Sequence, residues 1–97
     1  MRVVVESGED DDHGVALCYR VLRRLASSPY VASVGHVKDY IRAPKANGYQ
    51  SLHATVVPSA RNLPRFEVQI RTVAMDRDAT HGDASHRRYK RAQRRAP

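Results

Sequence analysis

Apolar residues recur every three or four positions between residues 13 and 27, a spacing that places them on one face of a helix. These apolar positions are Val15, Leu17, Cys18, Val21, Leu22 and Leu25. Asp10, Asp11 and Asp12 stand at the start of the helix, where carboxylates cap the first turn and complement the helix dipole. Capping is therefore their expected role, in preference to metal binding. Pro29 follows the last apolar position closely and ends the predicted helix.

Four apolar or alternating runs predict strands. The first, residues 2–6, contains three consecutive valines and is typical of a buried strand. A short strand is predicted within residues 31–37. Residues 51–57 and 66–71 predict two more strands, and the loop of residues 58–64 between them indicates an antiparallel hairpin.

The rest of the chain predicts a second helix, from residue 73 to about residue 91, and a basic tail at residues 87–97. The chain has 97 residues, which suits one small domain spanning residues 1–97. Of these residues 41% are hydrophobic, as expected for a globular domain and not for a disordered polyelectrolyte.

The formal net charge is +7, from 17 Lys and Arg against 10 Asp and Glu. A basic surface favours anionic partners, which include nucleotides, nucleic acids and acidic membranes. The lone cysteine, Cys18, excludes an intramolecular disulfide, and its place in the apolar stripe predicts a packed thiol. No apolar run reaches membrane-spanning length and no signal-peptide core is present. This pattern favours the cytoplasm, or an organelle stroma if a targeting segment has been lost, and no membrane partner is expected.

The run at residues 66–71 alternates between apolar and polar residues, so one of its faces is expected to be core and the other polar. The apolar side chains are Phe66, Val68 and Ile70, and the polar ones are Glu67, Gln69 and Arg71. On an antiparallel partner strand, His53 is predicted to share the polar face with Glu67. Alternation alone favours the simpler interpretation, a solvated sheet face with cross-strand pairs.

The segment before this hairpin gathers two lysines, two tyrosines and an asparagine. They are Lys38, Tyr40, Lys45, Asn47 and Tyr49. Lysines bind phosphates as point charges, and tyrosine rings offer flat faces for stacking a base. An asparagine can both donate to and accept from a purine edge. Singly, Asn-Gly is an ordinary turn and a tyrosine is a packing residue, but their gathering in one segment is less easily explained that way.

Three motifs in this region resemble successive motifs of the RelA/SpoT synthetase family in sequence, order and spacing. They are Lys-Asp-Tyr at residues 38–40, Pro-Lys-Ala-Asn-Gly-Tyr-Gln-Ser-Leu-His at residues 44–53 and Glu-Val-Gln-Ile-Arg-Thr at residues 67–72. Positions between Met75 and Lys90 also resemble the family's closing helix. The resemblance implies an α+β fold similar to nucleotidyltransferases, in which helices flank a mixed β-sheet. It also implies the transfer of pyrophosphate from ATP to the 3′-hydroxyl of GDP or GTP.

The resemblance implies a role for each polar residue of these motifs. The residues implied to bind the acceptor nucleotide are Lys38, Tyr40, Lys45, Asn47, Tyr49 and His53. Of these, Tyr49 would stack on the guanine, the asparagine would read its edge, and the lysines and His53 would hold phosphates. Glu67 would bind magnesium or accept the proton of the attacking hydroxyl, with Gln69 and Arg71 in support.

The chain departs from the family pattern at its start. The family's Asp-x-x-Gly-x-Arg motif should precede Val3, but only Arg2 matches it. The aspartate of that motif is the second metal-binding carboxylate, and Glu67 alone is a poor magnesium site. We therefore expect the acceptor half of a synthetase domain, truncated on its N-terminal side and weak or inactive as this short chain. Hydrolase activity is not expected, because the histidines show no His-Asp metal arrangement, and His81 and His86 are expected on the surface.

Two other functions stay open. A non-catalytic guanine-nucleotide-binding or regulatory module would keep the motif segment without transfer. An RNA- or ribosome-binding protein would use the cationic run at residues 87–95, although a solvated helix end is the favoured explanation of that run. The exposed edge of the first strand favours association into a homo-oligomer.

Overall fold

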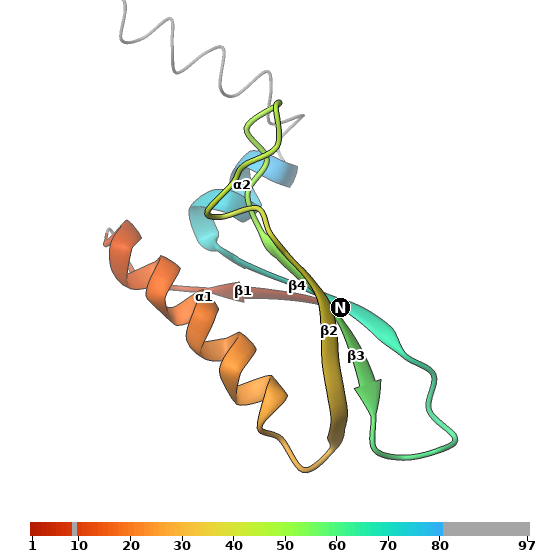
Figure 1. Ribbon diagram of the computed structural model, residues 1–97. Coiled ribbons are helices and arrows are strands. Elements are labelled where there is room, and N and C mark those ends of the chain that lie inside the picture. The colour runs from red at the N-terminus through yellow and green to blue at the C-terminus, as the bar shows by residue number, and fades with distance from the viewer. Residues whose placement is uncertain (9, 81–97) are drawn as a thin grey trace, which may run out of the picture.

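The computed structural model describes residues 1–8 and 10–80, which form four strands and two helices (Figure 1). In chain order these are β1 (Arg2–Val5), α1 (Asp11–Ala26), β2 (Val31–Asp39), β3 (Leu52–Pro58), β4 (Phe66–Thr72) and α2 (Val73–Thr80). The predicted second helix is confirmed as far as Thr80. Its remainder, the basic tail, His81 and His86 lie outside the described residues.

The strands form one sheet in the order β1-β4-β3-β2. Strands β2, β3 and β4 pair antiparallel with their neighbours, whereas β1 pairs parallel with β4. The predicted β3–β4 hairpin is confirmed, as is the mixed sheet of an α+β fold. Helix α1 lies along one face of the sheet, and α2 follows directly from the end of β4 (Figure 1).

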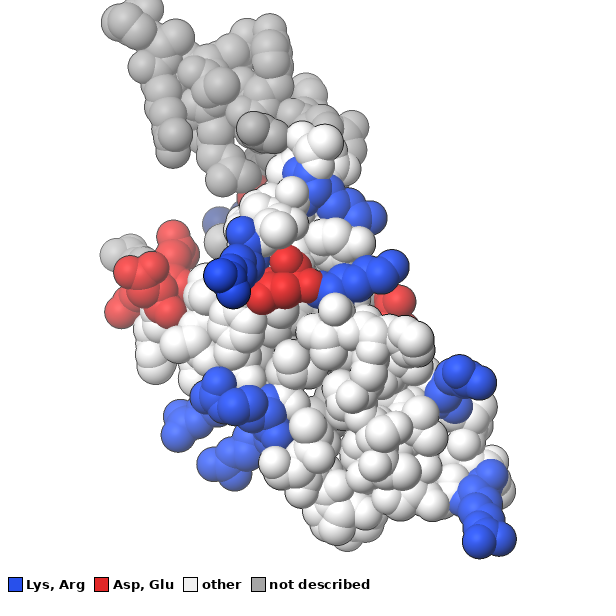
Figure 2. Space-filling model, viewed as in Figure 1, with Lys and Arg blue, Asp and Glu red and all other residues white. Residues whose placement is uncertain are grey.

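Helix α1 begins where the acidic residues predicted it. The N-cap is Asp10, whose side chain accepts a hydrogen bond from the amide of His13 at 3.0 Å. Acidic side chains in the first turn and basic ones in the last turn both complement the helix dipole. Figure 2 shows the acidic group over the beginning of α1 and a separate basic group further along the helix.

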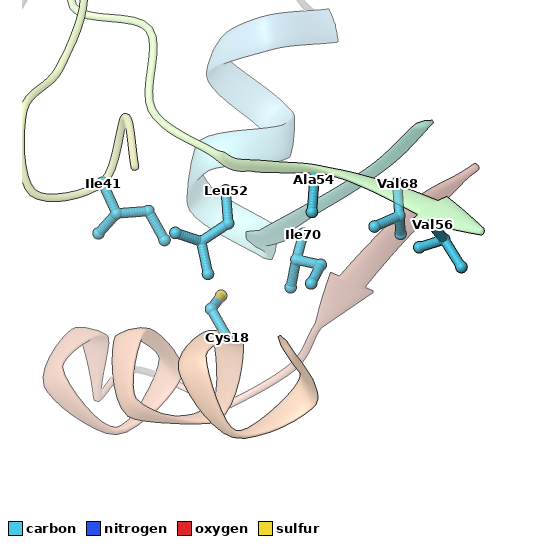
Figure 3. Packing of buried hydrophobic residues seen from close by; sticks show 7 residues of the cluster. All are labelled: Cys18, Ile41, Leu52, Ala54, Val56, Val68 and Ile70. Atoms are coloured by element: carbon cyan, nitrogen blue, oxygen red, sulfur yellow. The ribbon is translucent and has the colours of Figure 1, made fainter. Parts of the chain in front are cut away.

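The core lies between α1 and the facing side of β3 and β4. Its buried residues are Cys18, Ile41, Leu52, Ala54, Val56, Val68 and Ile70 (Figure 3). The sulfur of Cys18 points from the helix toward Leu52, so the thiol is a packed group as predicted (Figure 3). Burial raises the pKa of this thiol to about 11, which leaves it protonated at neutral pH.

The packed face of α1 differs from the predicted stripe at two positions. Tyr19 packs against the core, although the apolar pattern left it out, while Leu17 is half-buried without joining the core. A tyrosine can cover apolar surface with its ring and still reach a polar partner with its hydroxyl. Neither helix in the part of the chain that the structure describes is long and apolar enough to cross a membrane.

Strand β1 is not the buried strand that its valine run predicts. Among the described strands it pairs with β4 alone and lies at the edge of the sheet, and Val4, on the face opposite α1, is 39% exposed. Val3 and Val5 do pack against the core, because they point to the face that α1 covers. The run is therefore apolar on both faces, but the described elements cover only one of them.

Strand β2 is longer than predicted and takes in Lys38 and Asp39, which lie beyond the predicted residues 31–37. The pairing with β3 is irregular between Gly35 and Lys38, and His36 there has a φ of 49°. A β-bulge of this kind adds a residue on one strand and then lets pairing resume. The ladder resumes with Lys38 opposite His53.

Candidate functional site

A row of polar residues crosses the sheet on the face that α1 leaves open. His53 of β3 lies opposite Lys38 of β2 on one side and opposite Gln69 of β4 on the other. Gln69 in turn pairs with Arg2 of β1, so the row spans all four strands. Because paired residues project to the same side of a sheet, the four side chains share one face.

Glu67 lies on the same open face, two residues before Gln69 on β4. It pairs with Thr55, two residues from His53 on β3, which confirms that His53 and Glu67 share a face. Gln69 donates a hydrogen bond to Glu67 Oε1 at 3.0 Å. That bond is the main cause of a lowered pKa for Glu67; burial opposes it, and the positive charges of Lys38 and of His53 when protonated add to it. The carboxylate is therefore ionised at neutral pH and can accept a proton or bind a cation.

Three aromatic rings meet above the row. The ring of His53 lies 5.2 Å from that of Tyr40 and 5.7 Å from that of Tyr49, both nearly perpendicular to it. The ammonium of Lys45 lies 4.9 Å from the Tyr40 ring centre and 5.7 Å from the Tyr49 ring centre, within cation–π distance. The segment between β2 and β3 thus folds back over the polar face and brings its lysine there.

A compact turn holds this lysine in place. Gly48 donates its amide to the carbonyl of Lys45 at 2.8 Å, and Lys45 donates its own amide to the carbonyl of Tyr49 at 3.1 Å. The side-chain oxygen of Asn47 accepts from the amide of Tyr49 at 3.0 Å. Gly48 has a φ of 86°, a backbone conformation that residues other than glycine adopt only with strain. Asn47 and Gly48 thus do form a turn, as the simpler interpretation predicted. The same turn holds Lys45 against the rings.

A chain of polar contacts links the rings to β4. The hydroxyl of Tyr49 lies 2.9 Å from Nε2 of His53, and Arg71 Nη1 donates to that hydroxyl at 3.1 Å. Burial lowers the pKa of His53 most, and the charges of Lys45, Arg71 and Lys38 lower it further, while Glu67 opposes them. The imidazole is therefore neutral at neutral pH, and it can form a hydrogen bond with the tyrosine hydroxyl without adding a charge to the site.

Arg71 is buried, with only 4% of its surface exposed, although the alternation predicted an open polar position. Its Nε lies 3.2 Å from Oδ1 of Asp76 in α2, and Nη1 of Arg2 approaches the same oxygen at 3.5 Å. No sequence pattern marks Asp76 as a partner of Arg71. Asp76 follows Arg71 by five residues and lies in the first turn of a helix, where an acidic residue is common for other reasons. Its position along the chain therefore does not predict the ion pair with Arg71.

A second missed contact anchors the segment between β2 and β3. The hydroxyl of Tyr19 in α1 donates to Asp39 Oδ2 at 2.6 Å, and Asp39 Oδ1 accepts from the amides of Ile41 and Arg42. Burial opposes ionisation of Asp39, but these three donors lower its pKa overall. Burial and the bond to Asp39 together raise the pKa of Tyr19 to about 12. The carboxylate therefore fixes the turn that follows β2 to the helix behind the sheet.

The structure thus brings together eight of the nine residues that the motifs predicted. They are Lys38, Tyr40, Lys45, Tyr49, His53, Glu67, Gln69 and Arg71. Asn47 is exposed in the turn beside them. A separate hollow of about 230 Å³ lies between α1 and α2, and its lining includes none of these nine residues.

Glu67 supplies a carboxylate to the open face, beside His53 and Lys38. No group of three or more His, Cys, Asp or Glu side chains within residues 1–8 and 10–80 is arranged to hold a metal ion. A magnesium ion in a nucleotide site commonly takes one or two carboxylates and completes its shell with phosphates and water. Glu67 fits the part of one such ligand, but the described residues do not complete a site by themselves.

The chain matches the family described as the region found in RelA / SpoT proteins over residues 1–94. It is 52% identical over 73 residues to the bifunctional (p)ppGpp synthase/hydrolase SpoT of Escherichia coli K12, covering 75% of this chain and 10% of that protein. It is 43% identical over 90 residues to a probable chloroplastic GTP diphosphokinase of rice, covering 93% of this chain and 11% of that protein. The chain therefore spans about a tenth of the length of these curated relatives.

Solved structures of small alarmone synthetases are similar in fold. Small alarmone synthetase 2 of Bacillus subtilis aligns with a TM-score of 0.67 and 30% identity, covering 99% of this chain and 49% of that one. Small alarmone synthetase 1 of the same organism, bound to its product pppGpp, aligns with a TM-score of 0.62 and 31% identity, covering 78% of this chain and 41% of that one. The matching region is thus about half of each solved chain.

Proposed function

We propose a function from the premise that this chain belongs to the RelA/SpoT family: its open sheet face is the guanine-nucleotide acceptor site of a GTP diphosphokinase-type domain. In this proposal residues 1–97 are the acceptor half of a synthetase domain. The reaction is the transfer of pyrophosphate from ATP to the 3′-hydroxyl of GDP or GTP. A relative with a solved structure is bound to pppGpp, the product of that transfer to GTP.

One observation carries the proposal: two lysines flank a cluster of three aromatic rings on a single open face. Lys45 lies over the tyrosine rings, and Lys38 pairs with His53 beneath them. A nucleotide needs a flat surface for its base and cations for its phosphates, and both kinds of group meet here. An RNA-binding surface would need repeated stacking positions along a groove, whereas Tyr40, Tyr49 and His53 form a single cluster beside two lysines, which suits a single nucleotide better.

The residues can be assigned to steps of that reaction. The guanine stacks on Tyr49 and its edge faces Asn47. The phosphates attract the ammonium of Lys45 away from the rings, because an ammonium pairs more strongly with phosphate than with an aromatic face. Neutral His53 then offers a hydrogen bond without repelling the lysines.

Glu67 is the proposed proton acceptor. The 3′-oxygen of the acceptor attacks the β-phosphorus of ATP, the bond from that phosphorus to the oxygen bridging it to the α-phosphorus breaks, and AMP leaves. The hydroxyl proton passes to the ionised carboxylate of Glu67, which Gln69 orients through its hydrogen bond. Magnesium, when bound with Glu67 as one ligand, would neutralise phosphate charge, as phosphoryl-transfer reactions require.

Calorimetric titration with GDP, and with ATP as comparison, tests the acceptor site. We expect saturable binding that favours GDP, and a loss of at least tenfold in affinity for Lys45→Ala, because the variant removes a phosphate contact. Arg61→Ala is the matched control, since it removes one positive charge from an exposed position in the β3–β4 loop. Equal binding of the two nucleotides, or equal losses in the two variants, would mean that binding follows net charge alone.

Glu67→Gln separates catalysis from binding. In the proposed enzyme it abolishes the weak transfer expected of the parent chain and leaves GDP affinity within about threefold, because the amide keeps the shape of the carboxylate but cannot accept the proton. A non-catalytic regulatory module would show the same GDP affinity in both proteins and no transfer in either.

The compartment proposed is the cytoplasm or a plastid stroma, the latter because the rice relative is named chloroplastic.

A further inference from the structure

We propose that Asp76 is a positioning residue for the nucleotide site, acting through Arg71 on the hydroxyl of Tyr49 and the ring of His53. The inference rests on the proposed function, because it assigns a support to the same site. Asp76 lies in α2, outside the motif residues that contact the rings. It does not touch the nucleotide in this account.

Three consecutive contacts connect Asp76 to His53. Asp76 Oδ1 lies 3.2 Å from Arg71 Nε, Arg71 Nη1 lies 3.1 Å from the Tyr49 hydroxyl, and that hydroxyl lies 2.9 Å from His53 Nε2. The contacts run from α2 through β4 and the β2–β3 segment to β3. Residues from four separate parts of the chain are thereby held in one arrangement.

The burial of Arg71 makes its partner necessary. The side chain of Arg71 is 5% exposed, and a buried charge is costly unless an opposite charge and hydrogen bonds compensate it. The guanidinium is a rigid planar group, so the position of Nε determines where Nη1 can point. A carboxylate that holds Nε therefore also aims Nη1 at the hydroxyl of Tyr49.

The interaction of Asp76 with Arg71 depends on charge more than on a directed hydrogen bond. Neither Arg71 Nε nor Asp76 Oδ1 has a hydrogen-bond partner in the described part of the chain, although they lie 3.2 Å apart. Arg2 approaches the same carboxylate oxygen at 3.5 Å. Removing the charge of Asp76 therefore leaves the guanidinium groups of Arg2 and Arg71 close together without a neutralising carboxylate. We expect Arg71 to move as a result.

The test compares Asp76→Asn, Asp76→Glu and the control Asp12→Asn in the full chain, with GDP as the titrant. Asp12→Asn changes the net charge by the same amount at an exposed position in the first turn of α1. For variants that keep the circular dichroism of the parent, we expect Asp76→Asn to weaken GDP binding about tenfold. Asp76→Glu should restore binding to within about threefold, and the control should match the parent.

A double variant distinguishes positioning from a general structural role. If Asp76 acts through the tyrosine hydroxyl, adding Asp76→Asn to Tyr49→Phe should weaken GDP binding no further than Tyr49→Phe alone. A merely structural role would lower the melting temperature and give additive effects on affinity. Additive losses, or parental affinity in folded Asp76→Asn, would overturn the proposal.

A nucleotide-free measurement keeps the proposal separate from the proposed function. The NMR signals of the Arg71 Nε–H group and the His53 imidazole should change in Asp76→Asn and stay unchanged in Asp12→Asn. If the parent protein does not bind GDP, the proposed function fails, and these signals still decide the positioning. Unchanged signals in Asp76→Asn would reject it.

Discussion

The hydroxyl of Tyr49 lies 2.9 Å from Nε2 of His53, so a residue of the β2–β3 segment and a residue of the sheet share one hydrogen bond. In our account one of them stacks the base and the other faces the phosphates. The bond therefore ties together the two ends of the proposed acceptor site before any nucleotide arrives. Such preorganisation reduces the ordering that binding requires.

His53 should make stability depend on pH in the weakly acidic range. Its pKa is lowered in the folded protein, so below about pH 6.5 the unfolded chain takes up more protons than the folded one. The free energy of unfolding therefore falls as the pH falls from 6.5 to the folded-state pKa, and then levels off. Melting temperatures at pH 7.5 and 5.5 should differ less in His53→Gln than in the parent. The remaining histidines are common to both proteins, so an identical decrease in the two would argue against this role.

Tyr19→Phe should destabilise the protein by about 1–2 kcal/mol, because it removes a hydrogen bond to an ionised carboxylate. The lost donor lies 2.6 Å from Asp39, whose pKa should rise in the variant. Urea denaturation measures the loss of stability. Tyr30→Phe is the control, since Tyr30 is 82% exposed and the same change there should alter stability by less than about 0.5 kcal/mol. Equal effects of the two substitutions would show that the bond to Asp39 contributes nothing.

Gly48→Ala should cost about 1 kcal/mol and should also weaken GDP binding. Gly48 has a φ of 86°, which an alanine adopts only with strain, and its amide closes the turn that presents Lys45. Gly35→Ala is the matched control in β2, where an added Cβ meets nothing within 4 Å. We expect that control to leave thermal stability and GDP affinity unchanged. A Gly48→Ala protein with parental affinity would separate the turn from the binding site.

Ile70→Val should lower the free energy of unfolding by about 0.5–1.5 kcal/mol, because it removes a buried methylene and leaves a small cavity. Ile70 is fully buried on β4 between the open face and α1. Leu63→Val makes a comparable change at a position that is 55% exposed, and it should shift stability by less than about 0.5 kcal/mol. Chemical denaturation of both variants checks the placement of the core.

The elements with local signals were predicted well from the sequence. The spacing of apolar residues located α1, the aspartate at position 10 marked its cap, and strict alternation separated the two faces of β4. The order of the three motifs also anticipated which side chains the fold brings together. Each of these signals depends on neighbours along the chain or on a long contiguous motif.

The features that the sequence did not predict depend on contacts between distant segments. The length of β2 follows from a bulge at His36, and no local pattern marks a histidine for a positive φ. The exposure of Val4 depends on the described elements leaving its face of β1 uncovered, and the burial of Arg71 is accompanied by its contact with Asp76 in the next element. Tyr19 and Asp39 are twenty residues apart, so only the packing of α1 against the sheet reveals their bond.

The most direct test of the acceptor site is an NMR titration of the chain with GDP that follows the His53 imidazole and the Tyr49 ring. The account predicts saturable shifts at both rings with one dissociation constant, and much smaller shifts with ATP at the same concentrations. Unchanged ring signals under saturating GDP, or shifts confined to the arginines of α1, would contradict the placement of the nucleotide on the open face of the sheet.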